Sequence, residues 1–252
     1  MQQISLPKST YLLAIAEELK TSRWAWCFLA VLVVAVRHFL GDEARPLGSK
    51  FGDTDDALRL VQIREFLING SWYDTRLPSI GAPEALNSHW SRLIDLPIAW
   101  LISLFALFTT YLNAEVLAQI VWPLLLLLVL ARILALEAER RAGTSATIVV
   151  LGLLVLTPSG LFQFQPGRID HHNVQILCAV GGILLLQRAI TQPAAGWWAG
   201  SLMALGLAVG LEALPLVAAA LGLACLLACF DVSARAGACR AVIALAIGLV
   251  AS

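Results

Sequence analysis

Long apolar runs recur along the whole 252-residue chain and constrain its fold more than any other feature. A helix of about 20 apolar residues spans the hydrocarbon core of a bilayer. Because lipid offers no hydrogen bonds, each spanning segment must satisfy its own backbone groups, as a helix does. Hydrophobic residues make up 59% of the chain and charged residues only 13%. The sequence therefore predicts an all-α polytopic membrane protein with a single transmembrane domain over residues 1–252.

Seven apolar runs are predicted as membrane spans. They are residues 24–40, 116–136, 147–162, 174–190, 197–211, 213–230 and 241–252. The glycine-rich stretch from Gly200 to Gly210 is predicted to let two helices approach closely. Because the last run ends with the sequence itself, we expect the chain to be a truncated part of a longer protein.

Residues 41–92 form the longest polar stretch, and residues 41–113 are predicted to be one external loop. Within it, residues 55–68 are typical of an amphipathic helix, because Leu60, Ile63 and Leu67 share one face. The segment Asp53-Thr54-Asp55-Asp56, here called the acidic turn, occupies the cap and first turn of this helix. A loop of this length usually has a function.

The end of this loop decides the topology. Residues 93–112 are apolar, but Asp95 and Pro97 interrupt them and leave about fifteen uninterrupted residues, which is short for a span. We expect a helix that lies at the membrane interface. If this segment does not cross, the basic residues that flank the spans all fall on one side, as the positive-inside rule requires. These residues are Lys8, Lys20, Arg23, Arg140, Arg141, Arg188, Arg235 and Arg240.

The same arrangement places the acidic turn, residues 168–173 and Glu212 together on the non-cytoplasmic face. That face is periplasmic, extracellular or lumenal, and a bacterial inner membrane is the expected location. If residues 93–112 did cross, Arg140 and Arg141 would lie outside, and the membrane would separate Asp53 from Asp170. The charge rule favours the first arrangement.

The segment Arg168-Ile169-Asp170-His171-His172-Asn173, here called the motif loop, gathers charged and polar groups between two apolar runs. Such groups are expensive in a bilayer unless they face water, a partner or a metal. Two carboxylates, from Asp53 and Asp170, together with the imidazole of His172 suit Mn²⁺ or Mg²⁺. A metal there can neutralise a phosphate leaving group, and Arg168 can add a second positive contact to phosphate.

Structural interpretations compete with these assignments. Asp53 and Asp170 both stand where a helix N-cap is expected, and a capping carboxylate stabilises a helix by about 0.5–2 kcal/mol without a metal. Trp90 and Arg92 are also typical membrane anchors. Glu212, followed by Pro215, also marks a bend between two helices, although its carboxylate would face the same aqueous cavity.

The order of these features resembles the amino-terminal membrane half of the oligosaccharyltransferase catalytic subunit, in the GT-C glycosyltransferase superfamily. The segment Asp53-Thr54-Asp55-Asp56-Ala57-Leu58-Arg59 is similar to that family's first-loop aspartate with an arginine six residues on. Asp170-His171-His172 is similar to its Asp-x-His motif in the second external loop. The resemblance covers about residues 20–230 and implies a GT-C-like helical bundle, with further family elements beyond Ser252.

The resemblance also implies the roles of the site residues. It makes Asp53, Asp170 and His172 the ligands of a divalent metal, Mn²⁺ or Mg²⁺. The candidate catalytic residues are Asp53, Asp55, Asp56 and Asp170. The candidate substrate contacts are Arg59, His89, Trp90, Arg168, His171 and Glu212.

The expected function is a metal-dependent membrane glycosyltransferase. It would move a sugar or oligosaccharide from a polyprenyl-phosphate-type lipid carrier to a protein, glycan or lipid acceptor at the external face. A transporter with an Asp/His cation or proton relay is the main alternative, and a non-catalytic assembly subunit is a third. Membrane lipids are expected partners, and no nucleic-acid motif is present.

Overall fold

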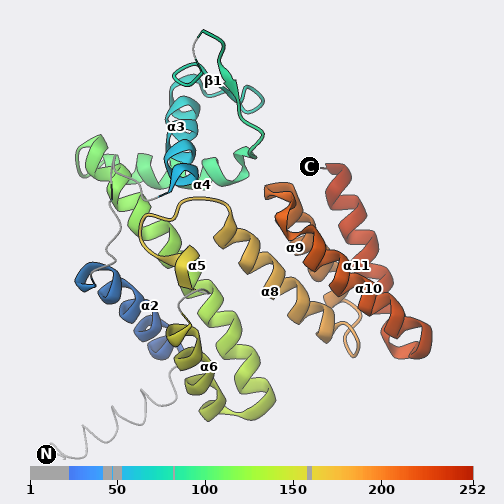
Figure 1. Cartoon of the computed structure of the whole chain (residues 1–252). Helices are drawn as coiled ribbons and strands as arrows, with labels where there is room; N and C mark the ends of the chain where they lie inside the picture. The colour runs from blue at the N-terminus through green and yellow to red at the C-terminus, as the bar shows by residue number, and fades with distance from the viewer. Residues whose placement is uncertain (1–22, 42–46, 48–52, 82, 158–160, 252) are drawn as a thin grey trace, which may run out of the picture. The chain divides into compact units, whose positions relative to one another are not determined.

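The structure is a computed structural model that describes residues 23–41, 47, 53–81, 83–157 and 161–251 (Figure 1). Its fold is all-α apart from one short hairpin, in which β1 (Arg76–Leu77) pairs antiparallel with β2 (Leu86–Asn87). Four helical segments in the described part are long and apolar enough to cross a membrane. They are Arg23–Leu40, Tyr111–Ala142, Leu211–Phe230 and Val232–Ala251. The prediction of an all-α membrane protein is therefore confirmed at this level.

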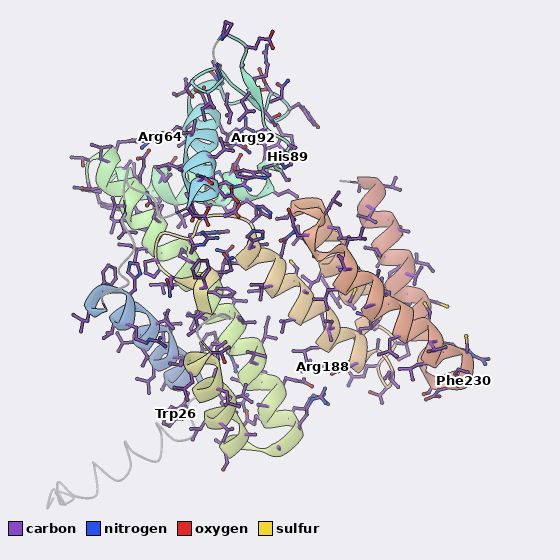
Figure 2. The ribbon with its side chains drawn as sticks, viewed as in Figure 1. Trp26, Arg64, His89, Arg92, Arg188 and Phe230 are labelled. Carbon is purple, nitrogen blue, oxygen red and sulfur yellow. The ribbon has the colours of Figure 1, made fainter. Side chains whose placement is uncertain are left out.

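The chain divides into two compact units. The first contains α2 (Arg23–Leu40), residues 127–142 of α5 (Tyr111–Ala142), α6 (Thr144–Leu156) and the short 3-10 helix η1 (Phe162–Phe164). Its helices pack around a buried cluster of Cys27, Ala131, Ala135 and Leu151, with Trp26 against it (Figure 2). Gly143 has a φ of 78°, a conformation that glycine adopts without strain, and this allows the tight turn from α5 into α6.

The second unit contains the remaining described elements and both candidate clusters. Its helices are α3 (Thr54–Asn69), α4 (Arg92–Ala106), residues 111–126 of α5, α8 (His172–Arg188), α9 (Ala195–Val209), α10 (Leu214–Phe230) and α11 (Val232–Ala251). The 3-10 helix η2 (Leu211–Ala213) joins α9 to α10. One core cluster lies among α3, α4 and α5, and a second lies among α8, α9, α10 and α11.

The amphipathic helix in the long loop is confirmed as α3. Asp53 is its N-cap, and its side chain accepts a hydrogen bond from the Asp55 amide at 3.1 Å. Leu60 and Ile63 are buried in the first core cluster, and Leu67 packs against it. Ion pairs also join α3 to two other helices: Asp95 of α4 pairs with Arg59, and Glu115 of α5 pairs with Arg64.

Several expected segments have different bounds. α5 begins at Tyr111 and runs for 32 residues, so the external loop ends earlier than expected. α6 ends at Leu156 after 13 residues and is short for the span predicted over 147–162. α8 and α9 cover 17 and 15 residues, close to the predicted segments 174–190 and 197–211.

The prediction that the last helix begins near residue 241 is wrong. α11 begins at Val232 and includes both Arg235 and Arg240, which were expected to flank the span. The carboxylate of Asp231 accepts hydrogen bonds from the Ser233 amide at 2.8 Å and hydroxyl at 2.7 Å, which satisfies donors at the helix start. The alanine-rich sequence that follows favours a helix despite its two arginines.

Small residues bring α9 and α11 into close contact, as the glycine-rich stretch predicts. A Cβ atom added to Gly200 would overlap the Ala241 carbonyl oxygen and would lie 2.8 Å from the Ala244 Cβ atom. A Cβ atom added to Gly196 would overlap the Gly237 carbonyl oxygen in the same way. The backbone approach therefore depends on the absence of side chains at these positions.

Gly200→Ala should consequently destabilise the second unit by about 1–3 kcal/mol, because the added methyl group must push two helix backbones apart. Gly222→Ala is the matched control, since a Cβ atom there meets nothing within 4 Å. Alanine has the higher helix propensity, so the control should be neutral or slightly stabilising. Thermal unfolding of the two variants in detergent measures the difference, and equal midpoints would contradict the expected packing.

Candidate functional site

The acidic turn and the motif loop meet through the carboxylate of Asp56. This carboxylate accepts hydrogen bonds from the backbone amides of Ile169 at 2.9 Å and Asp170 at 3.1 Å. It also pairs with the guanidinium of Arg168 at 2.6 Å. These bonds join residues that are 112 to 114 positions apart in the sequence. They connect the start of α3 to the loop just before α8.

Arg168 lies between two carboxylates, because it also pairs with Asp53. The side chain of Asp56 is 2% exposed and that of Asp53 is 30% exposed, so their pKa values respond differently to the same arginine. Burial raises the pKa of Asp56 to about 6, even though Arg168 and the two amides lower it. Burial of Asp53 is weaker, and the hydrogen bonds from Arg168 and the Asp55 amide lower its pKa.

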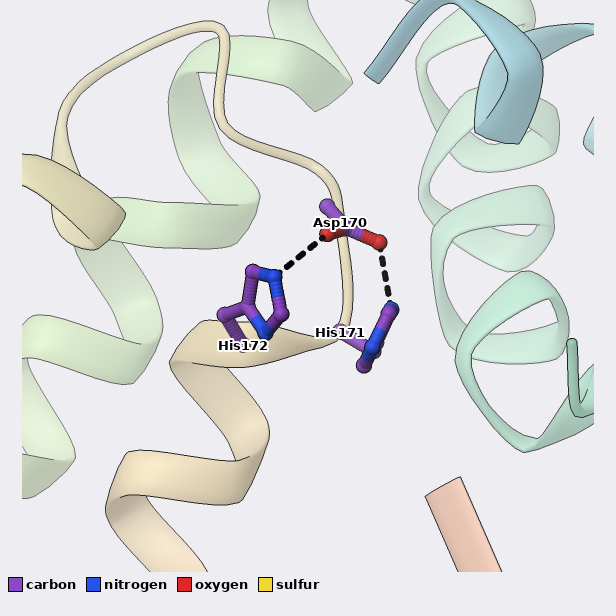
Figure 3. Close-up of side chains that lie close together, drawn as sticks. All are labelled: Asp170, His171 and His172. Carbon is purple, nitrogen blue, oxygen red and sulfur yellow. Dashed lines mark hydrogen bonds and ion pairs between the residues drawn. The ribbon is translucent and has the colours of Figure 1, made fainter. Parts of the chain in front are cut away.

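Asp170, His171 and His172 form the group best able to hold a metal among the described residues (Figure 3). Each offers a ligand atom, and these atoms lie within 4.8 Å of one another. The Oδ1 atom of Asp170 lies 2.5 Å from His171 Nδ1, and its Oδ2 atom lies 3.4 Å from His172 Nε2. Burial of Asp170 opposes ionisation, but His171 and Arg59 lower its pKa to about 2, so the carboxylate is ionised at neutral pH.

Two buried atoms of this group have no hydrogen-bond partner in the described structure, namely Asp170 Oδ2 and His171 Nε2. Leaving a buried polar atom without a partner costs about 1–3 kcal/mol. Asp170 Oδ2 lies 3.4 Å from His172 Nε2, and His171 Nε2 lies 3.5 Å from Glu212 Oε2, which are ion-pair distances. A carboxylate oxygen with imidazole nitrogens is a donor set that suits Mn²⁺. The residues therefore fit a divalent metal.

Arg59 lies beside this group and is completely buried. Its Nη2 atom is 3.3 Å from His171 Nδ1 and 3.6 Å from Asp170 Oδ1. Its Nη1 atom bonds the Asp95 carboxylate at 3.0 Å, and its guanidinium carbon lies 4.6 Å from the centre of the Trp90 ring. Arg59 thus connects α4 and α3 to the motif loop.

The junction of α9 and α10 closes the other side of the group. The side-chain amide of Gln175 donates hydrogen bonds to Glu212 Oε2 and to the Gly210 carbonyl oxygen, both at 2.8 Å. The carboxylate of Glu212 is more than half exposed and faces His171. Gly210 leaves room for these contacts, since a Cβ atom there would lie 2.6 Å from Gln175 Nε2 and 2.9 Å from His171 Cδ2.

The structure groups Asp170 with His171 and His172, whereas the sequence predicts Asp53, Asp170 and His172 as the metal ligands. Asp53 pairs with Arg168 and caps α3, and it is not a member of the Asp170-His171-His172 group, whereas His171 is. The physical reason is that the guanidinium of Arg168 attracts the Asp53 carboxylate. Asp53 still lies close enough to Asp170 for the two charges to interact.

The competing interpretation, in which Asp170 caps a helix, is wrong. α8 begins at His172, and its N-cap is His171, which makes no side-chain capping bond. Capping therefore does not explain Asp170, whose carboxylate instead contacts the imidazoles of His171 and His172.

The expected substrate contacts also divide into buried and accessible groups. Arg59 and Arg168 are buried and paired with carboxylates, whereas His89 is exposed and Trp90 is partly buried under Arg59. The interpretation of Arg92 as a membrane anchor is wrong, because Arg92 is buried and bonds Asp95 at 3.1 Å (Figure 2). Asp55 lies partly exposed on the first turn of α3.

Three further polar residues at the site were not predicted from the sequence. Gln62 and Asp95 support Arg59 from α3 and α4, and Gln175 holds Glu212 from α8. For Asp95 a signal was present, since a carboxylate inside an apolar segment needs a partner.

No protein-family model, curated protein or solved structure matches this chain.

Proposed function

We propose that this chain is a metal-dependent membrane glycosyltransferase that takes a saccharide from a polyprenyl-phosphate-type lipid carrier. The acceptor would be a protein, glycan or lipid at the external face. The observation that carries the proposal is the meeting of the acidic turn and the motif loop at the Asp170-His171-His172 group. The GT-C-like order of features along the sequence supports the same proposal.

Asp170, His171 and His172 would hold the divalent cation, which when bound neutralises the negative charge of the departing phosphate. The residues around them fix the group in place. Asp56 holds the backbone of Asp170 through its amide and holds Arg168 through its guanidinium. Because Arg168 is already paired with two carboxylates, we assign it to positioning rather than to direct contact with phosphate.

The acidic turn supplies the group that would orient the acceptor. The carboxylate of Asp56 is occupied by Arg168 and two amides, and the partly exposed carboxylate of Asp53 is also paired with Arg168, which leaves Asp55 as the candidate on this turn. Asp55 would accept a hydrogen bond from the acceptor's attacking group and, for a hydroxyl acceptor, take its proton. Glu212 and His172 are accessible on the motif-loop side and would contact the saccharide or its phosphate.

The position of α4 supports a shared face for the two clusters. The segment that contains α4 begins beside α3, where Asp95 meets Arg59, and ends beside α3, where Glu115 meets Arg64. A segment whose two ends lie against the same 16-residue helix does not need to cross a bilayer. This is the arrangement that the positive-inside rule favours.

The transporter alternative predicts ionisable groups near the middle of the membrane-spanning helices. Here the ionisable groups of the site lie at helix starts and junctions: Asp56 in the first turn of α3, Asp170 before α8, and Glu212 between α9 and α10. Their location favours a reaction at a membrane surface over transport through the helix bundle.

Metal removal tests the proposal. In the full-length protein, a chelator should stop the release of saccharide from the lipid carrier, and added Mn²⁺ should restore it. His172→Ala should weaken Mn²⁺ binding at least about tenfold, because it removes one of the proposed ligands. His89→Ala should leave Mn²⁺ binding unchanged, since His89 lies outside the group. Saccharide release that persists in chelator would overturn the metal-dependent reaction.

A further inference from the structure

Asp95 is a buried carboxylate in the first half of α4, which is apolar apart from Arg92 and Asp95, and helix capping does not explain it. Ser91 is the N-cap of α4 and accepts a hydrogen bond from the Leu93 amide at 3.3 Å. The side chain of Asp95 is 0% exposed. Removing a carboxylate from water costs several kcal/mol unless partners compensate for it. Its presence therefore needs a reason other than the start of the helix.

The partners of Asp95 converge on it from α3 and α4. Its Oδ1 atom accepts from Arg59 at 3.0 Å, and its Oδ2 atom accepts from Gln62 at 2.7 Å and Arg92 at 3.1 Å. Gln62 and Arg92 have further partners in the long loop: Gln62 also bonds Ser88 and the Trp90 carbonyl oxygen, and Arg92 donates to the Asp74 carbonyl oxygen. Arg59 is the one of these three donors that also contacts the motif loop in the described structure.

Arg59 approaches the one nitrogen of His171 that also lies against Asp170. His171 Nδ1 is 2.5 Å from Asp170 Oδ1 and 3.3 Å from Arg59 Nη2. A guanidinium can only donate hydrogen bonds and an ionised carboxylate can only accept them, so Nδ1 cannot satisfy both at once. The position of Arg59 therefore bears on whether Nδ1 or Nε2 carries the proton of a neutral His171 ring.

We infer that Asp95 is a positioning residue: by holding Arg59 against His171 and Asp170, it sets the hydrogen bonding and orientation of the Asp170-His171-His172 group. Asp95 touches neither histidine itself. Its effect passes through a guanidinium that is stacked on Trp90 and has no freedom to reach solvent. Supporting residues of this kind typically change metal affinity by about 10–100-fold.

The first measurement needs no metal and does not depend on the proposed function. Histidine side-chain ¹⁵N spectra of the metal-free, full-length protein report which ring nitrogen is protonated, with His171 assigned from the signals lost in His171→Gln. Asp95→Asn should shift the His171 signals. Glu115→Gln is the matched control, because Glu115 is another buried carboxylate that pairs with an arginine of α3, but Arg64 has no contact with His171.

The second measurement rests on the proposed function. Asp95→Asn should weaken Mn²⁺ binding about 10–100-fold, and Glu115→Gln should not. Arg59→Lys should have a similar effect, and adding Asp95→Asn to Arg59→Lys should then change little, because both substitutions act through the same guanidinium.

The outcomes separate the two proposals. If Asp95→Asn leaves the His171 signals unchanged, or changes them no more than Glu115→Gln does, the positioning role is overturned. If Asp95→Asn has its full effect in the Arg59→Lys background, the route through Arg59 is overturned. If the His171 signals shift but the unaltered protein binds no Mn²⁺, the positioning role stands and the proposed function fails.

Discussion

Asp170→Asn should abolish metal-dependent transfer, with a loss of more than about a thousandfold, while the protein remains folded. The substitution keeps the shape of the side chain but removes the one negative charge in the Asp170-His171-His172 group. An amide oxygen is a weaker ligand for a divalent cation than an ionised carboxylate, and the low pKa of Asp170 means that the carboxylate is ionised under working conditions.

The fold of Asp170→Asn should survive because residue 170 is bonded to Asp56 through its backbone amide. The amide of Asp170 donates to Asp56, and that bond does not depend on the Asp170 side chain. Transfer and Mn²⁺ binding should be measured together on the purified full-length protein, with Asp74→Asn as the control, since Asp74 pairs with Arg76 away from the site. A variant that retains Mn²⁺ binding and transfer would remove Asp170 from the proposed ligands.

Local features of the fold were readable from the sequence because they depend on nearby residues. α3 and its Asp53 cap follow from apolar spacing and from a carboxylate at the helix start. The close approach of α9 and α11 follows from glycine. The start of α11 differs from the predicted span because Arg235 and Arg240 are expected to flank a span, whereas the alanine-rich background and the Asp231 cap support a helix that includes them.

The candidate site was only partly predictable because its chemistry depends on pairings between distant segments. The sequence placed Asp53 and Asp170 at one site, and the structure brings the acidic turn and motif loop together through Asp56. No sequence pattern reveals that Asp53 pairs with Arg168, or that His171 rather than Asp53 lies in one group with Asp170 and His172. These choices depend on burial and on charge balance in three dimensions.

The buried network around Asp95 shows the same limit. Spacing along α3 puts Arg59 and Gln62 off its apolar face, which normally indicates exposure to solvent. Both are instead buried, and both donate hydrogen bonds to the carboxylate of Asp95 in α4. An isolated helix pattern cannot distinguish a solvated polar face from one that is paired inside the protein.

Arg168→Met should cause the largest loss of stability of the substitutions considered, about 3–5 kcal/mol near pH 8. Removing one partner of a buried ion pair leaves the other charge without compensation. Here Asp56 would remain buried with only two backbone amides to stabilise its negative charge, and Asp53 would lose its main favourable contact. Denaturant titration in detergent measures the loss, with Arg76→Met at the exposed Asp74 pair as a control that should change little.

The loss should depend on pH in a direction fixed by Asp56. Its pKa is raised in the folded protein, to about 6, so the folded state holds this proton more tightly than the unfolded state does. A raised carboxyl pKa favours folding at low pH, and this contribution disappears as pH rises through the folded pKa. Without Arg168 the pKa should rise further, because burial is then less opposed. The cost of Arg168→Met should therefore be smaller at pH 5, where Asp56 is protonated and neutral, than at pH 8.

A second substitution isolates the charge from the shape of Arg168. Asn at position 56 can still accept hydrogen bonds from the Ile169 and Asp170 amides, but it carries no charge. Arg168→Met combined with Asp56→Asn should therefore recover part of the stability lost at pH 8 and should show little dependence on pH. If the single variant is as stable at pH 8 as at pH 5, and Asp56→Asn recovers nothing, the Asp56–Arg168 pair does not join the acidic turn to the motif loop in the way the contacts indicate.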